Sequence, residues 1–118
     1  GDFLIGVYDQ KKDKFVTVSK IGTGLSDEEW RELKVKSSKF KVQSKPARYD
    51  VDKAMECDVW MEPKLVVEIL ADEITRSPVH TALFALRFPR LKQFRDKQPE
   101  DATSLGEIEK MYKNQSQK

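Results

Sequence analysis

The chain is 118 residues long, 36% of them charged and 38% hydrophobic, with a formal net charge of +2. These values are typical of one compact globular domain and exclude a disordered or collagen-like chain. No apolar run approaches the roughly 20 residues that cross a bilayer, and no signal-peptide pattern opens the chain, so we expect no membrane partner. The single cysteine, Cys57, excludes an internal disulfide and is typical of a reducing compartment.

Positive charge is concentrated in one segment. Residues 87–97 contain five positive side chains and one negative one, a net charge of +4, so the rest of the chain carries −2. A basic stripe on a nearly neutral body favours a docking site for phosphate. A solvated strand face remains the alternative for each single residue. The positive residues are Arg87, Arg90, Lys92, Arg95 and Lys97, and the negative one is Asp96.

The first part of the chain predicts a β-hairpin followed by a helix. Residues 3–8 form a short strand with few polar positions, residues 14–20 form a second strand with Val16 and Val18 on one face, and the polar residues 9–13 form the turn between them. Gly22, Thr23 and Gly24 then interrupt the second strand. Ser26 and Glu29 have the spacing of a capping box, which predicts that a helix begins after Ser26. The five lysines from position 34 to position 45 indicate the end of this helix and an exposed loop.

The remainder predicts several short strands and a final helix. We expect strands at residues 49–51, 59–61, 65–71, 81–87 and 91–95, with Pro89 bending the chain or leaving it at an edge. Ser104 and Glu107 form a second capping box before an amphipathic helix, and residues 114–118 form a polar tail. This order predicts a single mainly β domain over residues 1–118: a five-stranded antiparallel Greek-key OB-fold barrel with one internal helix and a C-terminal helix.

Three groups of segments resemble the C-terminal domain of ATP-dependent DNA ligases. They are residues 3–9 with 18–24 and 26–29, residues 59–64 with 66–69, 71–75 and 77–78, and residues 86–90 leading into 95–103. The match follows the family's order along nearly the whole chain. The segment from Arg-Phe-Pro-Arg to Asp-Lys-Gln-Pro-Glu is the most specific part. Because the chain also begins at Gly1 rather than at a methionine, we interpret it as a piece of a larger ligase that lacks the nucleotidyltransferase domain.

The resemblance implies a role in nick sealing during DNA replication, repair or recombination. In that reaction, ATP adenylates a lysine of the nucleotidyltransferase domain of the same parent chain. AMP then passes to the 5′-phosphate of nicked double-stranded DNA, and the 3′-hydroxyl displaces it. The OB domain closes over the adenylation site in the first step and presents another face to the DNA afterwards.

The resemblance also sets expectations for cofactors, assembly and location. ATP and Mg²⁺ belong to the parent enzyme, and we expect neither tight cofactor binding nor a metal site in this domain. We expect a monomer inside the cell, in the cytoplasm or nucleoid of a prokaryote or in the nucleus of a eukaryote.

The last family motif has the form Arg-x-Asp-Lys, whereas Arg95, Asp96 and Lys97 are contiguous here. A slip of one residue in a strand reverses the facing of its side chains, which leaves the register of Arg95 against Lys97 open. We predict that Arg95 and Lys97 bind the β,γ-phosphates of ATP and that Asp96 holds one of them by a charged hydrogen bond. Arg87 and Arg90 are the next candidates, with an ion pair to a carboxylate on the barrel as an equal alternative.

A second set of residues is predicted to contact DNA. Lys12, Lys14 and Lys20 are candidates to neutralise backbone phosphates without reading sequence. The lysines from position 34 to position 45 are either further phosphate contacts or, more commonly for such a run, a solvated surface. Gly22 and Gly24, on either side of Thr23, either allow close approach to the minor groove or provide a turn with positive φ.

We find no self-sufficient catalytic motif in the sequence. It lacks a Lys-x-Asp-Gly adenylation motif, a Walker loop and a nucleophile elbow, so we expect no ligase activity from this chain alone. His80, the only histidine, is interpreted as a packed or surface residue.

Three alternatives remain at this point. A non-catalytic OB-fold module would stack bases on exposed aromatics, but the aromatics here have core-like spacing. The equivalent domain of an mRNA capping enzyme is the second alternative, against which residues 22–24 and 98–103 favour the ligase. The third is a pure interaction domain, which gives no reason for the basic stripe.

Overall fold

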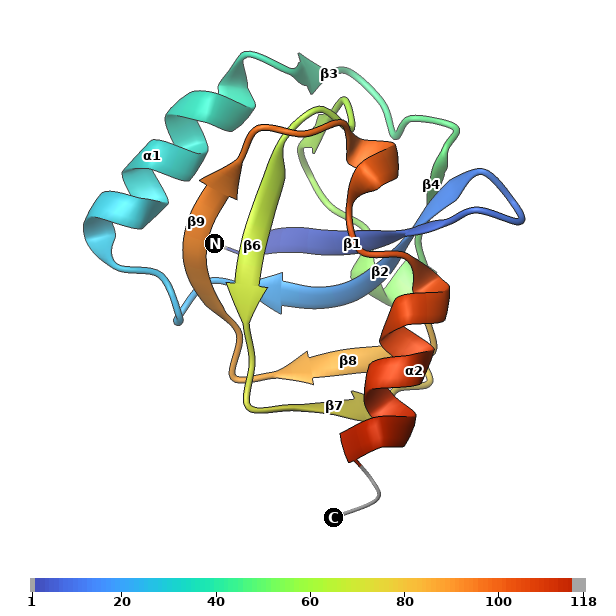
Figure 1. The fold of residues 1–118 in the computed structure, drawn as a ribbon. Helices are drawn as coiled ribbons and strands as arrows, with labels where there is room; N and C mark the ends of the chain where they lie inside the picture. Colours follow the sequence, from blue (N-terminus) through green and yellow to red (C-terminus); the bar gives the residue numbers. More distant parts are fainter. Residues whose placement is uncertain (1, 116–118) are drawn as a thin grey trace.

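The computed structural model describes residues 2–115 as a mainly β domain with two α-helices (Figure 1). The predicted hairpin is confirmed: β1 (Phe3–Asp9) and β2 (Lys14–Ile21) pair antiparallel. The other edge of β2 pairs with β4 (Tyr49–Asp50). Three further antiparallel pairs complete the strands: β3 (Lys41–Val42) with β5 (Trp60–Met61), β6 (Val66–Leu70) with β9 (Arg90–Arg95), and β7 (Glu73–Arg76) with β8 (Phe84–Arg87).

The predicted fold class, mainly β and OB-like, is confirmed, but the described strands do not pair as a five-stranded antiparallel barrel. The described residues form nine strand segments in four sheets that are not closed into a barrel, and β2 and β4 are parallel. Side chains replace part of the ladder where β2 meets the loop before β8. The Thr17 N–H donates to Thr81 Oγ1 at 2.8 Å, and the Thr81 N–H donates to Thr17 Oγ1 at 2.9 Å. The arrangement is therefore OB-like, with short sheets around a shared core.

The core lies between the β1–β2 hairpin, the β7–β8 hairpin and the C-terminal helix. Helix α2 (Leu105–Gln115) begins with the predicted capping box, in which Ser104 and Glu107 each accept a hydrogen bond from the other's backbone N–H. At its other end, the Gln115 side chain hydrogen-bonds both the N–H and the carbonyl of Ile74 in β7. The buried core residues are Val7, Val16, Val18, Ile74, Ala82, Phe84 and Ile108.

The predicted polar tail begins too early, because Asn114 and Gln115 belong to α2. Residues 116–118 lie outside the described part of the chain.

Helix α1 (Asp27–Ser38) also begins where the sequence predicts. The Ser26 side chain accepts from the Glu29 N–H at 3.1 Å, and the Glu29 side chain accepts from the Ser26 N–H at 2.9 Å. The helix lies beside β9, and the Lys36 ammonium is 4.8 Å from the centre of the Phe94 ring (Figure 1). Lys34 lies similarly over Trp30 at 5.2 Å. These contacts give part of the lysine-rich segment a packing role.

Residues 77–83 form a turn where the sequence analysis placed the start of a strand. The Ser77 hydroxyl lies 2.7 Å from His80 Nδ1, and Leu83 has a φ of 70°. His80 is half-buried, and this burial lowers its pKa, which fits the interpretation of a packed histidine. Two short 3₁₀ helices, η1 (Lys53–Met55) and η2 (Pro99–Asp101), lie in the connections before β5 and α2.

Candidate phosphate and DNA contact sites

Most of the basic stripe faces carboxylates of the neighbouring strands. Three acids from β6, β7 and the residues between them offset part of its net charge, and all seven side chains of these ion pairs are at least 29% exposed. Because β9 is extended, Arg90 and Arg95 lie at its opposite ends, about 16 Å apart. The ion pairs are Arg87–Glu73 at 3.3 Å, Arg90–Asp72 at 2.8 Å, Lys92–Glu68 at 3.4 Å and Arg95–Glu68 at 3.0 Å.

Arg87 and Arg90 therefore make the carboxylate contacts that the sequence analysis gave as their alternative. They do not gather with Arg95 and Lys97 into one cluster. Arg87 ends β8 and Arg90 begins β9, whereas Arg95 lies at the far end of β9.

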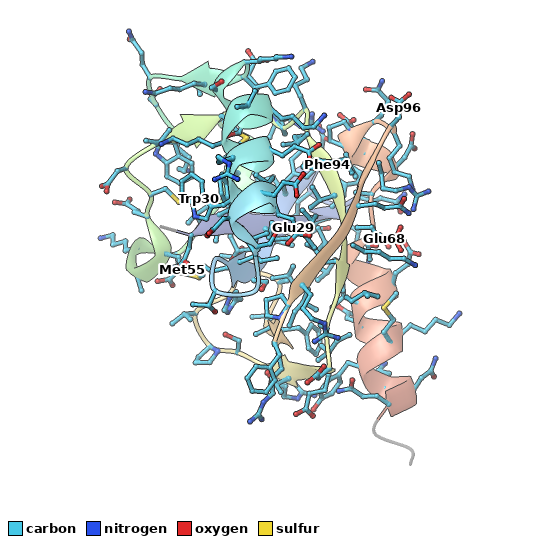
Figure 2. The ribbon with its side chains drawn as sticks, turned by 90° about the vertical axis from the view of Figure 1, so that its left-hand side faces the viewer. Glu29, Trp30, Met55, Glu68, Phe94 and Asp96 are labelled. Atoms are coloured by element: carbon cyan, nitrogen blue, oxygen red, sulfur yellow. The ribbon has the colours of Figure 1, made fainter. Side chains whose placement is uncertain are left out.

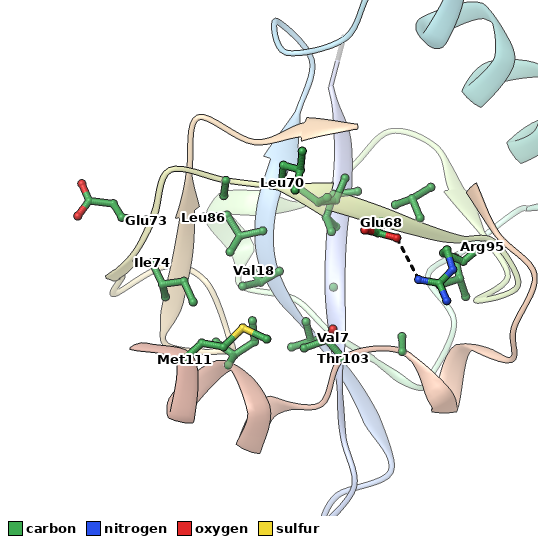
Figure 3. Close-up of a pocket in the computed structure, with 18 of the residues that line it drawn as sticks. Val7, Val18, Glu68, Leu70, Glu73, Ile74, Leu86, Arg95, Thr103 and Met111 are labelled. Carbon is green, nitrogen blue, oxygen red and sulfur yellow. Dashed lines mark hydrogen bonds and ion pairs between the residues drawn. The ribbon is translucent and has the colours of Figure 1, made fainter. Parts of the chain in front are cut away.

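Arg95 and Lys97 line one cavity, with a volume of about 430 Å³ (Figure 3). Its walls include apolar residues of β1, β6 and α2, such as Val7, Val66 and Ile108. Strand β9 ends at Arg95, so the alternation of a strand no longer governs the two residues that follow it. The contiguous Arg-Asp-Lys sequence thus brings both cations to the same cavity despite its missing residue.

Asp96 lies apart from this arrangement. It is exposed after the end of β9, and Figure 2 shows it away from Glu68. Among the hydrogen bonds of residues 2–115, none joins Asp96 to Arg95 or Lys97. The acid that binds Arg95 is Glu68, because β6 lies directly beside β9 and presents Glu68 opposite Gln93. The expected Asp96 contact is therefore replaced by one from the neighbouring strand.

Three donors of β9 contact the Glu68 carboxylate. Its Oε1 accepts from Gln93 Nε2 at 2.9 Å and from Arg95 Nη1 at 3.0 Å, while its Oε2 lies 3.4 Å from Lys92 Nζ. These hydrogen bonds, first of all the one from Gln93, hold the pKa of Glu68 below its usual value. Glu68 was not predicted as part of this site, since nothing local in the sequence relates residue 68 to residues 92–95.

Part of the predicted DNA-contacting set also lies together. Lys20, Gly22, Thr23 and Gly24 line a hollow of about 300 Å³, whose other wall is Phe88, Pro89 and Arg90. Lys12 and Lys14 lie elsewhere, because they belong to the β1–β2 turn and to the start of β2, whereas Lys20 lies near the end of that strand (Figure 1).

The backbone around this hollow explains why position 24 is a glycine. Neither Gly22 nor Gly24 has a positive φ, so a turn of that kind is not their role. A Cβ on Gly24 would lie 2.1 Å from the Pro89 carbonyl oxygen, so the close approach that it allows is to the chain's own backbone.

Phe88 also lines this hollow, although it was not among the predicted contact residues. It is 62% exposed, it has a φ of 53°, and the Arg87 guanidinium lies 5.4 Å from the centre of its ring. A non-glycine residue with positive φ is uncommon and costly, and such strain is concentrated at functional sites. The signal available in the sequence was an aromatic residue between Arg87 and Pro89, where a strand is interrupted.

Within residues 2–115, no group of three or more histidine, cysteine or acidic side chains is placed to hold a metal ion. None of the helices in the same residues is long and apolar enough to cross a membrane.

Comparison with known proteins identifies the family of this chain. A family model described as the ATP dependent DNA ligase C terminal region matches residues 1–98. A probable DNA ligase of Dictyoglomus thermophilum is 48% identical over 124 residues, which cover 98% of this chain and 21% of the relative. DNA ligases of Ignicoccus hospitalis and Thermoplasma volcanium are 44% and 42% identical, covering 100% and 98% of this chain and 21% of each relative.

The chain belongs to the family of ATP-dependent DNA ligase C-terminal regions. It spans about a fifth of the length of the curated relatives that it matches. The family assignment favours the ligase over the capping enzyme, the two resemblances that the sequence analysis weighed.

Proposed function

We propose that this domain places Arg95 and Lys97 against the β- and γ-phosphates of ATP while the nucleotidyltransferase domain of the same parent ligase forms its lysine–AMP bond. The observation that carries this proposal is that both cations line one cavity at the end of β9. Both are also open to solvent, since the Arg95 side chain is 43% exposed and Lys97 is exposed. A nucleotide held by a docked domain would therefore find both groups within reach.

The chemistry gives these two cations a purpose. Negative charge develops on the pyrophosphate leaving group, and fixed positive charge at that point lowers the barrier. Arginine offers a planar fork to two oxygens, and lysine offers a compact point charge. Mg²⁺ would bind with ATP at the nucleotidyltransferase domain and neutralise phosphate charge there. A domain that closes for this step can withdraw afterwards and leave room for DNA.

The experiment compares two steps in the full-length ligase that carries this domain. Lys97→Ala is expected to slow single-turnover self-adenylation by about 10-fold or more, because losing one such electrostatic contact costs at least that factor. Sealing of a nick that already carries AMP should change by less than about 2-fold. Lys110→Ala, which removes an exposed lysine of α2, is the matched control. Equal losses in both steps would contradict the proposal.

We also propose that the edge formed by Lys20, residues 22–24, Phe88 and Arg90 contacts nicked duplex DNA. Lys20 and the exposed Arg90, which also pairs with Asp72, can neutralise backbone phosphates there, and the exposed Phe88 ring lies 5.4 Å from the Arg87 guanidinium. Lys12 and Lys14 would join the same contact only if the duplex ran along β2. The distance from Lys14 to Lys20 is about 20 Å, roughly six base pairs of duplex.

Salt dependence tests this second proposal. In the adenylated full-length ligase, Lys20→Ala should weaken binding to a nicked duplex and reduce the slope of log K against log salt by about 1. Lys110→Ala again serves as the control. An unchanged slope for Lys20→Ala would show that this edge does not meet the DNA backbone.

A further inference from the structure

We infer that Glu68 is a positioning residue for self-adenylation, which holds one edge of the Arg95 guanidinium and leaves the other edge free for phosphate. The inference rests on the proposed function of Arg95 and adds the residue that would orient it. Glu68 does not itself touch the nucleotide in this account, since it acts through Arg95.

The contacts make Glu68 a fixed acceptor. Its side chain is 29% exposed, less than the 43% of Arg95 and the 53% of Lys92. Gln93 and Lys92 hold its two oxygens independently of Arg95. A carboxylate anchored in this way restricts the guanidinium that binds it more than a freely rotating one does.

The strand geometry explains how three donors reach one acid. Glu68 is opposite Gln93, but Ile69 is opposite Leu91, so Lys92 is an extra residue in β9. In a regular strand, Lys92 and Gln93 would point to opposite faces. A bulge changes the direction of a side chain, and bulges are common beside active sites. Here the bulge allows Lys92 and Gln93 to reach the same carboxylate.

Most N–H donors of the Arg95 guanidinium have no partner within the described residues. A guanidinium carries five N–H groups, and within the described residues only Nη1 of Arg95 is engaged, by Glu68. Lys97 lines the same cavity and is exposed. Glu68 thus binds Arg95, while Lys97 has no hydrogen bond or ion pair within residues 2–115, and both cations line the same space of about 430 Å³. Figure 3 shows Arg95 at one end of this space.

The other arginine pairs of the stripe differ in this respect. Asp72 and Glu73, which bind Arg90 and Arg87, are 55% and 48% exposed. Neither has a further hydrogen-bond partner among the described side chains. Arg90 also donates from Nη1 to the Phe88 carbonyl at 2.9 Å. Glu73 therefore offers a matched control, because it is an acid of the same type that binds an arginine on an adjacent pair of strands.

A double-mutant cycle in the full-length ligase tests the inference. Single-turnover self-adenylation is measured against ATP concentration for Glu68→Ala, Arg95→Ala and the double variant, and sealing of pre-adenylated nicks is measured alongside. We expect Glu68→Ala to slow adenylation about 10-fold in the parent but less than about 2-fold in the Arg95→Ala background. Sealing should not change. Glu68→Gln keeps the shape and the acceptor, so it should lose less than Glu68→Ala, and Glu73→Ala should lose nothing.

The outcomes separate the inference from the proposed function. If Arg95→Ala leaves adenylation unchanged, the proposed function fails. If Arg95→Ala slows adenylation but Glu68→Ala has the same effect in both backgrounds, Glu68 acts through general strand stability and the inference is overturned. Faster adenylation in Glu68→Ala would also overturn it, because Glu68 would then compete with phosphate. If Glu68→Ala does not fold by circular dichroism, Glu68→Gln completes the cycle: a smaller loss that disappears in the Arg95→Ala background supports the inference, and an equal effect in both backgrounds, or none, overturns it.

Discussion

Gly24 lies so close to Pro89 that a Cβ on it would be 2.1 Å from the Pro89 carbonyl oxygen. The atom in the way belongs to the backbone, so it cannot rotate aside as a flexible side chain does. The contact joins the connection between β2 and α1 to the connection between β8 and β9, and it shapes the hollow that we propose to meet DNA.

We therefore predict that Gly24→Ala destabilises the domain by about 1–3 kcal/mol, the usual cost of forcing an extra carbon into a packed contact. Urea unfolding followed by circular dichroism measures the free energy of unfolding. Gly106→Ala is the control, because its Cβ would come no closer than 3.9 Å to the Ser104 hydroxyl and lies in a helix. Equal stability of the two variants would contradict the assigned role of Gly24.

Individual contacts show which features of the site the sequence can predict. Both capping boxes were predicted correctly because each joins residues three positions apart. The local motif named Arg95 and Lys97 together but left open whether both face the same place, which the structure shows as one shared cavity. The acid that holds Arg95 could not be predicted, because Glu68 is 27 residues away and is brought close only by the β6–β9 pairing.

Arg48 connects three segments of the chain that are distant in sequence. Just before β4, it binds Asp13 in the β1–β2 turn and Glu100 in η2, each at 2.8 Å. Its guanidinium also lies 4.9 Å from the centre of the Phe15 ring. Hydrogen bonds from Tyr8 and then Arg48 lower the pKa of Asp13, and Arg48 lowers that of Glu100.

These pKa shifts predict a pH dependence with a definite sign. A carboxyl whose pKa is lower in the folded state stabilises the fold above its ordinary pKa, and this contribution is lost as the pH falls through the lowered value. The melting temperature of the unsubstituted domain should therefore fall more steeply from about pH 5 to about pH 2 than that of Arg48→Met. Arg31→Met, which changes an exposed arginine of α1, is the control. Parallel curves for the domain and Arg48→Met would contradict the role of this cluster.

The elements that the sequence analysis missed share a physical cause. Strand β3 has two residues and β7 has four, with one buried apolar residue in β7, so neither shows an alternating pattern long enough to detect. Each is extended because of its partner, β5 or β8. The parallel contact of β4 with β2 also depends on tertiary structure, since no turn between them fixes its register.

At the scale of the whole molecule, β9 connects the two proposed contact sites. Arg90 at its start lines the hollow with Lys20, and Arg95 at its end lines the cavity with Lys97. Because one small domain carries two separate basic sites, the arrangement supports the proposal that it contacts nucleotide phosphate in one step and DNA in another. The separation was hidden in the sequence, where Arg90, Arg95 and Lys97 belong to a single run.

The most direct test uses the reverse of self-adenylation, in which pyrophosphate attacks the lysine–AMP bond of the adenylated full-length ligase and releases ATP. This reaction isolates the phosphates that Arg95 and Lys97 are proposed to bind. We expect Lys97→Ala to raise the pyrophosphate concentration for half-maximal rate by about 10-fold, the effect of losing roughly 1.4 kcal/mol of binding, while AMP transfer to a nick keeps its rate. An unchanged pyrophosphate dependence in Lys97→Ala would contradict the account.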